Sequence, residues 1–177
     1  TWTPVALPAN EALLAPSQVN FVGKAANLYE LGYRFHGSAL VITRYLRSSF
    51  LWDRVRVQGG AYGAFCQFSQ LTGVFALVSY RDPNLLETLE VFDDCGRFLV
   101  ETDLSDDELS KAIIGTIGDL DAYMLPDAKG FASLVRLLTG NTVEVRQRIR
   151  DEVLNTTAGD FKAFGEMLAA VKAHGQV

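Results

Sequence analysis

The chain has 177 residues, of which 49% are hydrophobic and 21% are charged. That length suits one domain or a large piece of one, and the composition excludes a disordered chain because it provides a packed core. The formal net charge is −5, so the sequence lacks a basic surface for nucleic acid. No apolar run reaches the roughly 18 residues that span a bilayer. We therefore expect neither nucleic acid nor a membrane as a partner.

The beginning of the chain is typical of a linker. Residues 1–17 are irregular, contain three prolines (Pro4, Pro8 and Pro16) and lack the basic region of a secretory signal. We expect an interdomain linker over residues 1–17 and one folded domain over residues 18–177, as a fragment of a larger protein.

The two cysteines, Cys66 and Cys95, fall in apolar strand and helix patterns. Two cysteines without a disulfide framework predict buried thiols in a reducing compartment.

A strand and a long helix are predicted in the first third of the chain. The apolar residues in 18–28 predict a strand. Ser38 is a suitable N-cap for a helix that runs to about Asp53, with apolar residues at helical spacing. The Gly59-Gly60 pair then breaks any helix.

A hairpin and a series of helices follow. Residues 61–69 and 74–81 alternate as strands do, and Gly73 in the turn between them can take a positive φ. Helical patterns then cover residues 82–102, 105–126, 131–139, 142–154 and 157–173. The predicted fold is α+β, with an antiparallel sheet covered on one face by several helices.

Three features of the helical half carry specific expectations. Ser105 and Glu108 form a capping-box pattern at the start of their helix. Gly115 and Gly118 lie inside that helix, where each costs about 1 kcal/mol relative to alanine, so we expect close packing against them. The acidic pairs Asp93-Asp94 and Asp106-Asp107 are expected on solvated helix surfaces or caps.

The sequence contains no complete catalytic motif. The only histidines are His36 and His174, and neither has a second ligand at a zinc-binding spacing. His36 is expected in a turn before a helix, and His174 at a helix C-terminus. No G-x-S-x-G, P-loop or G-x-G-x-x-G is present. We expect no metal in this chain.

One segment has a plausible functional chemistry. Arg56 and Tyr62 stand six residues apart and flank Gly59-Gly60. Arginine offers a planar fork of donors and tyrosine a hydroxyl on a rigid ring, while the glycines let another chain come close. Such a group can hold a peptide backbone. The alternative is purely structural: a surface salt bridge at Arg56, a glycine turn, and a tyrosine packed in the sheet.

Three segments carry a family resemblance, namely Val19–Leu28 (VNFVGKAANL), Leu51–Gly63 (LWDRVRVQGGAYG) and Leu104–Gly130 (LSDDELSKAIIGTIGDLDAYMLPDAKG). With these segments the chain resembles the C-terminal domain of a zinc metallopeptidase of the pitrilysin (insulinase) family, in the presequence protease branch. The resemblance implies an α+β domain repeated four times, in two halves that close around a peptide. It also implies a catalytic zinc held in the first half by an inverted H-x-x-E-H, which this sequence lacks.

The resemblance assigns roles to four residues. Tyr62 matches the tyrosine that hydrogen-bonds the oxyanion or the scissile carbonyl, and Arg56 the arginine that holds a substrate carbonyl. Gly59 and Gly60 would place the backbone beside the substrate. Arg54 lies eight residues from Tyr62 and does not match. The implied activity is endoproteolysis of short unstructured peptides, such as cleaved targeting presequences, with zinc in the full-length parent and none in this chain.

The resemblance also implies a partner and a compartment. The partner is the N-terminal catalytic half of the same polypeptide, so the fragment alone is expected to be inactive. The compartment is the mitochondrial matrix or plastid stroma in a eukaryote, and the cytoplasm in a bacterium. The family domain ends with another strand after its last helix, whereas this sequence ends at Gln176-Val177. A noncatalytic structural or core subunit of the same fold is the alternative function.

Overall fold

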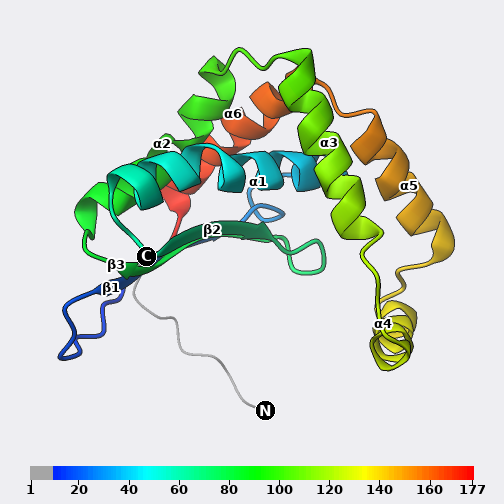
Figure 1. Cartoon of the computed structure of the whole chain (residues 1–177), viewed down its shortest axis with the longest axis horizontal. Helices are drawn as coiled ribbons and strands as arrows, with labels where there is room; N and C mark the ends of the chain where they lie inside the picture. Colours follow the sequence, from blue (N-terminus) through cyan, green and yellow to red (C-terminus); the bar gives the residue numbers. More distant parts are fainter. Residues whose placement is uncertain (1–9) are drawn as a thin grey trace.

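A computed structural model describes residues 10–177, and the first nine residues of the predicted linker lie outside the described residues. The described part is α+β, with a three-stranded antiparallel sheet and helices on one of its faces (Figure 1). The predicted fold class is confirmed. The elements are β1 (Asn20–Asn27), α1 (Ser38–Ser48), the π-helix η1 (Trp52–Gln58), β2 (Gly63–Phe68), β3 (Val74–Asp82), α2 (Leu86–Glu101), α3 (Asp106–Leu120), α4 (Pro126–Leu138), α5 (Val143–Leu154) and α6 (Ala158–His174).

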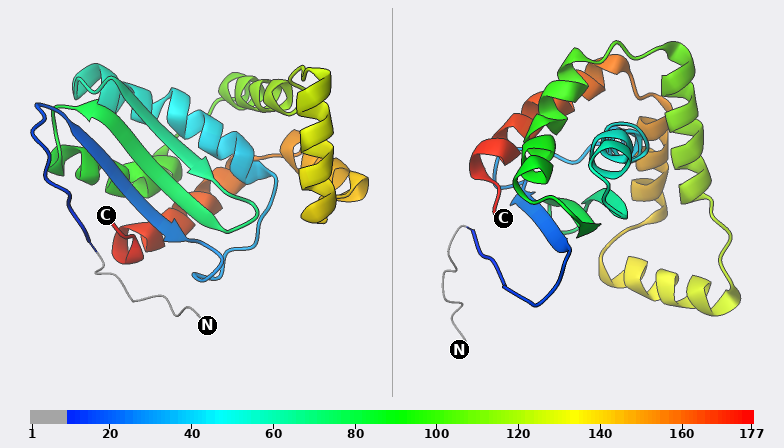
Figure 2. Two further views of the ribbon diagram at one scale, coloured as in Figure 1. Left: turned by 90° about the horizontal axis from the view of Figure 1, so that it is seen from below. Right: turned by 60° about the vertical axis from the view of Figure 1, so that its left-hand side comes forward.

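The sheet has the strand order β1-β3-β2, and both pairs are antiparallel. The predicted hairpin is confirmed as β2 and β3, and Gly73 in its turn has a φ of 76°. Strand alternation sends Phe75 and Leu77 into the core under the helices. Within residues 10–177, the opposite face, seen from below in the left view of Figure 2, carries no helix layer. The sheet therefore has one buried and one open face.

Helix α1 begins at Ser38 itself, one residue earlier than predicted, because Gly37 and not Ser38 is the N-cap residue. Other groups satisfy the first N–H groups. The Glu152 carboxylate accepts the Gly37 N–H at 2.6 Å, and Nδ1 of His36 accepts the Ser38 N–H at 3.3 Å. Tertiary and neighbouring side chains thus replace the serine cap, and His36 lies in the turn before the helix as predicted.

The helical path does not end at Asp53 as predicted. It continues as η1 to Gln58, one residue before the glycine pair. Buried Leu51 and Val55, four residues apart, keep this stretch against the core. The glycines end the helix as predicted, but burial of Val55 extends it to them.

Helices α2 and α6 cross at two glycines. A Cβ on Gly96 would lie 2.7 Å from the Gly165 carbonyl oxygen, and a Cβ on Gly165 would lie 2.7 Å from the Gly96 carbonyl oxygen. Only glycine at both positions permits this approach, which holds the two helices together over β1 (Figure 2).

The helical half follows the predicted caps but differs at two boundaries. The capping box of Ser105 and Glu108 is confirmed. Helix α3 ends at Leu120, six residues before the predicted end, and α4 begins at Pro126 rather than at Phe131. Proline suits the first helical turn because its missing N–H would have no partner there.

The helix after β3 also begins later than predicted. The strand continues through Asp82, and α2 starts at Leu86. The Asp82 carboxylate accepts the Asn84 N–H at 2.9 Å, which holds the chain in a turn between the two elements.

The two glycines in α3 differ. A Cβ on Gly115 would lie 2.3 Å from Nε of Arg44, whereas a Cβ on Gly118 would have no neighbour within 4 Å. The predicted close packing is therefore confirmed at Gly115 and wrong at Gly118. Helix α4 buries none of its residues and stands away from the sheet (Figure 1).

The chain end returns to the sheet. Gln176 forms an isolated antiparallel bridge with Ala25 on the free edge of β1. Val177 also accepts a hydrogen bond from the Glu11 N–H at 2.9 Å. The last residues thus lie along the free edge of β1, as an isolated bridge and not as a full strand. The boundary predicted between linker and domain, at residue 17, remains a prediction.

One member of the acidic pair on α2, Asp93, departs from its expected solvated position. Asp93 forms an ion pair with Lys24 of β1, whose side chain is only 8% exposed. A buried ammonium requires a counter-charge, and the neighbouring helix supplies it. Asp94 pairs with the exposed Arg97, as expected of a helix surface.

No helix described between residues 10 and 177 is long and apolar enough to cross a membrane.

Candidate substrate-binding turn

The turn between η1 and β2 is tightly closed by its own backbone. The Gly59 N–H donates to the Arg54 carbonyl five residues earlier at 3.1 Å, and the Gly60 N–H donates to the Arg56 carbonyl at 3.0 Å. Gly60 has a φ of 77°, a conformation that favours glycine. Short π-helical segments are frequent at functional sites. The closed turn therefore fixes the backbone positions of Arg56 before it and Tyr62 after it.

A second loop holds the turn from outside. The side-chain amide of Asn84 donates to the Gly59 carbonyl at 2.6 Å. Asn84 is itself fixed, because its backbone N–H donates to the carboxylate of Asp82 at 2.9 Å. Asp82 is fully buried and also accepts from the Thr88 hydroxyl at 2.8 Å. The glycine turn is therefore tied to the end of β3 and the start of α2.

Arg56 lies on an aromatic platform at the surface. Its guanidinium carbon is 4.0 Å from the centroid of the Trp52 ring, one helical turn earlier. Within residues 10–177, Arg56 forms no ion pair, so the structural alternative of a surface salt bridge does not describe this arginine. Arg54 lies over Phe50 instead, with its guanidinium carbon 5.8 Å from the centroid of that ring.

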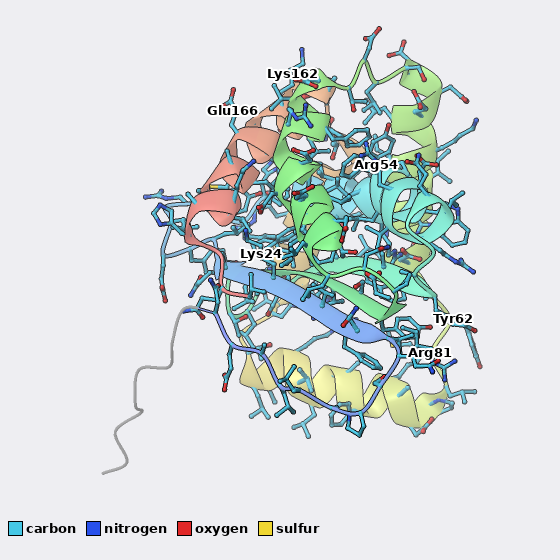
Figure 3. The ribbon with its side chains drawn as sticks, turned by 90° about the vertical axis from the view of Figure 1, so that its left-hand side faces the viewer. Lys24, Arg54, Tyr62, Arg81, Lys162 and Glu166 are labelled. Atoms are coloured by element: carbon cyan, nitrogen blue, oxygen red, sulfur yellow. The ribbon has the colours of Figure 1, made fainter. Side chains whose placement is uncertain are left out.

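Tyr62 is a largely exposed tyrosine at the surface. The residue is 60% exposed, and within the described part of the chain its hydroxyl makes no hydrogen bond, whereas the hydroxyl of Tyr29 donates to the Gln70 carbonyl. The Tyr62 ring contacts Tyr80 at a centroid distance of 5.3 Å and lies 5.6 Å from the guanidinium carbon of Arg81. Figure 3 shows Tyr62 and Arg81 together at one end of the sheet.

The open sheet face begins directly at this tyrosine. Tyr80 stacks on Phe65 with ring centroids 5.8 Å apart and 15° between the ring planes. Phe21, opposite Tyr80 on β1, is 72% exposed, and Val78 is also exposed. An apolar surface on three strands thus adjoins the ring of Tyr62.

The structure therefore places the four predicted site residues on one turn. It does not join Arg56 to Tyr62 by any hydrogen bond within residues 10–177; each has its own aromatic neighbour. Their common element is the turn at Gly59-Gly60, which leaves both polar groups accessible.

Comparison with known proteins settles the family. Residues 10–177 match the family model described as the PreP C-terminal domain. The chain belongs to this family. The match covers nearly the whole chain and confirms the resemblance inferred from the three sequence segments.

Several relatives of the PreP C-terminal domain are much longer than this chain. It is 53% identical over 175 residues to presequence protease 1, chloroplastic/mitochondrial, of Arabidopsis thaliana, covering 99% of this chain and 16% of that protein. It is 36% identical to Protein HypA of Clostridium perfringens, covering 90% of this chain and 16% of that protein. It is 35% identical to the mitochondrial presequence protease of Aspergillus oryzae, covering 82% and 14%. The chain thus spans about a sixth of the length of these relatives.

The fold has a counterpart among solved structures. A crystal structure of a protein assigned as a zinc protease, from Bordetella pertussis Tohama I, superposes with a TM-score of 0.64 at 19% identity. The likeness covers 90% of this chain and 94% of that one. At this identity the likeness shows the fold alone, and it agrees with the family assignment.

Other candidate groups of this PreP domain do not gather into a site. Among residues 10–177, no three His, Cys, Asp or Glu side chains are placed to hold a metal ion. His174 lies in the last turn of α6, as predicted. Cys66 and Cys95 are both buried free thiols, also as predicted. Burial raises the pKa of the Cys66 thiol to about 12, so the reactive thiolate is strongly disfavoured.

Three neighbours of the site, namely Trp52, Tyr80 and Arg81, were not predicted from the sequence. Trp52 stands four residues before Arg56, a spacing that places two side chains on one helix face, and this signal was available. Tyr80 and Arg81 lie about twenty residues from Tyr62 in the chain. Only the pairing of β2 with β3 brings them to it.

Proposed function

We propose that this domain is the substrate-holding C-terminal part of a zinc metalloendopeptidase that degrades short unstructured peptides, such as cleaved presequences. The proposal is supported by family membership and by relatives named presequence proteases. Zinc in the parent protein would be held outside this chain, in the N-terminal part of the same polypeptide, and would supply Lewis-acid chemistry there. This domain would act on the peptide bond from the opposite side.

The observation that carries the proposal is the exposed Tyr62, whose hydroxyl makes no hydrogen bond within residues 10–177, beside a turn closed by backbone hydrogen bonds. Peptide-bond hydrolysis passes through a tetrahedral state in which the carbonyl oxygen gains negative charge. A fixed hydroxyl donor aimed at that oxygen stabilises it, by about 3 kcal/mol for one such donor. Tyr62 would donate to this oxyanion.

Arg56 would bind a neighbouring carbonyl of the substrate. The guanidinium lies over the Trp52 ring, and the absence of an ion pair within residues 10–177 leaves its donors available. Since the two residues flank one short turn, a peptide strand lying across that turn would meet both.

The two glycines have a structural role and a proposed binding role. A Cβ on Gly59 would lie 2.7 Å from the Val55 carbonyl oxygen, and Gly60 needs its positive φ. The turn therefore requires both. Their contribution to binding, in this proposal, is that no side chain blocks the approach to Tyr62.

Two substitutions in the full-length parent test the assignment. With an unstructured peptide as substrate, Tyr62→Phe and Arg56→Ala should each lower kcat/KM by at least about tenfold, or roughly 1.4 kcal/mol. Arg54→Ala is the matched control, since Arg54 shares the helix and also lies on an aromatic ring. It should stay within about twofold.

The alternative of a noncatalytic core subunit makes a different prediction. If unchanged kinetics were found for both Tyr62→Phe and Arg56→Ala, the site assignment would fall and the structural role would stand. The isolated 177-residue fragment should show no peptidase activity and near-zero zinc content. Stoichiometric zinc would contradict this assignment.

The relatives' names also support a compartment. The Arabidopsis relative is named as chloroplastic/mitochondrial and the Aspergillus relative as mitochondrial. We propose the mitochondrial matrix or the plastid stroma for a eukaryotic parent, where cleaved targeting presequences arise, and the cytoplasm for a bacterial one.

A further inference from the structure

Arg81 occupies an irregular position at the end of the sheet. On β1, Asn20 pairs with Asp82 and Phe21 pairs with Tyr80, so Arg81 is an extra residue without a partner on β1. Its φ is 48°, and it is the one non-glycine residue with a positive φ among those described. Bulges of this kind redirect a side chain and are common beside active sites.

The arginine contacts Tyr62 twice. Its carbonyl oxygen accepts the backbone N–H of Tyr62 at 3.2 Å, and its guanidinium carbon lies 5.6 Å from the centre of the Tyr62 ring. Figure 3 shows both side chains at the same end of the sheet. The next residue, Asp82, is fully buried and hydrogen-bonded, so the bulge has a fixed base.

An arginine is unfavourable at this backbone position. Residues other than glycine are strained at a φ of 48°, and glycine is the residue usually found there. The strained residue here is a long cation whose guanidinium forms no ion pair within residues 10–177. The aromatic ring of Tyr62 is the contact that the side chain does make.

We propose that Arg81 is a positioning residue for Tyr62. The bulge turns the guanidinium toward the tyrosine ring, and the cation–π contact limits the arc through which the hydroxyl moves. Tyr80 supports the ring from another side, at 5.3 Å. This inference rests on the proposed function of Tyr62, and it adds a second arginine, outside the Arg56–Tyr62 segment.

Replacement by glycine gives a test that is free of folding effects. Arg81→Gly removes the side chain and relieves the strained φ, so the midpoint of thermal unfolding of the full-length parent should stay the same or rise. Its kcat/KM on an unstructured peptide should nevertheless fall about threefold to tenfold, mainly in kcat, because a less ordered donor stabilises the transition state less. Arg81→Lys retains a cation near the ring and should recover to within about twofold of the native enzyme.

A double-mutant cycle separates positioning from direct binding. In the Tyr62→Phe background, Arg81→Gly should change kcat/KM by less than about twofold, since no hydroxyl remains to be positioned. An equal loss in both backgrounds would mean that Arg81 binds the substrate by itself, and would overturn the inference. So would an unchanged kcat/KM for Arg81→Gly alone. If Tyr62→Phe itself had no effect, the proposed function would fail as well, and the two failures are thereby distinguished.

Discussion

The Tyr80 ring covers Gly63, the residue directly opposite it on β2. A Cβ on Gly63 would lie 2.4 Å from Cε1 of Tyr80. Glycine therefore allows the ring to lie across the neighbouring strand, where it contacts both Tyr62 and Phe65. The orientation of Tyr62, the proposed oxyanion donor, thus depends on the next residue, Gly63, having no side chain.

Gly63→Ala should therefore destabilise the chain by about 1–2 kcal/mol, because the Tyr80 ring has to move. Equilibrium denaturation of the chain measures this change. The control is the same substitution in a Tyr80→Ala background, where it should be neutral or stabilising because alanine loses less backbone freedom than glycine. Equal costs in both backgrounds would show that the ring is not what excludes a side chain at Gly63.

Asn84→Ala should loosen the glycine turn, because it removes the hydrogen bond to the Gly59 carbonyl. We expect a loss of stability of about 1 kcal/mol and a several-fold lower kcat/KM of the full-length parent. The control is Asn155→Ala at the end of α5, whose side chain donates to the Asp151 carbonyl at an exposed helix end. That variant should leave kcat/KM unchanged, and a matching loss there would remove the special role of Asn84.

Replacement by alanine should have opposite effects at two helix glycines, one at the crossing of α2 and α6 and one in open space on α3. Gly96→Ala should cost about 2 kcal/mol or more, because its Cβ would meet the Gly165 carbonyl oxygen and force α2 and α6 apart. Gly118→Ala should stabilise the chain by about 0.5–1 kcal/mol, since it has space and alanine favours helix. Unfolding free energies from denaturant titration test both signs together.

The ion pair between β1 and α2 predicts a difference between adjacent aspartates. Asp93→Asn leaves the buried ammonium of Lys24 without its counter-charge and should cost about 1–3 kcal/mol. Asp94→Asn breaks only an exposed pair with Arg97 and should cost less than about 0.5 kcal/mol. Similar values for the two variants in denaturant titration would contradict the buried position of Lys24.

The buried thiols predict a loss of stability at alkaline pH. Burial raises the pKa of Cys66 from 9.0 to about 12, and that of Cys95 well above 9.0. The folded chain thus favours the protonated thiols. For Cys66 this contribution is fully present below pH 9 and falls as pH rises from 9 toward 12, by up to about 1.4 kcal/mol per pH unit. Cys95 acts in the same direction. Cys66→Ala should lower overall stability but flatten this alkaline slope.

Much of the fold was predictable from local pattern. The alternation on either side of Gly73 predicted the hairpin, and Ser105 with Glu108 predicted the start of α3. These features depend on residues a few positions apart, whose effect on the backbone is local. The helix end at Gly59 was predictable for the same reason, since glycine opposes helix wherever it occurs.

Long-range partners decided the features that the local pattern missed. Glu152, far along the chain, caps α1 at Gly37, so a serine cap is not needed. Burial of Val55 carries the helix past Asp53. Asp93 is polar by composition, yet it is drawn inward by Lys24 on a strand about seventy residues away. No window of sequence contains both partners of such contacts.

The candidate site divides in the same way. The sequence by itself determined the turn, the spacing of Arg56 and Tyr62, and the family to which the chain belongs, because all of these are properties of contiguous residues. Only the tertiary structure decided what surrounds Tyr62. The register of β2 on β3 brings Tyr80 and Arg81 to its ring, and the bulge at Arg81 turns a cation toward it. The physical reason that the sequence alone could not show these neighbours is strand pairing, which joins segments distant in the chain by backbone hydrogen bonds.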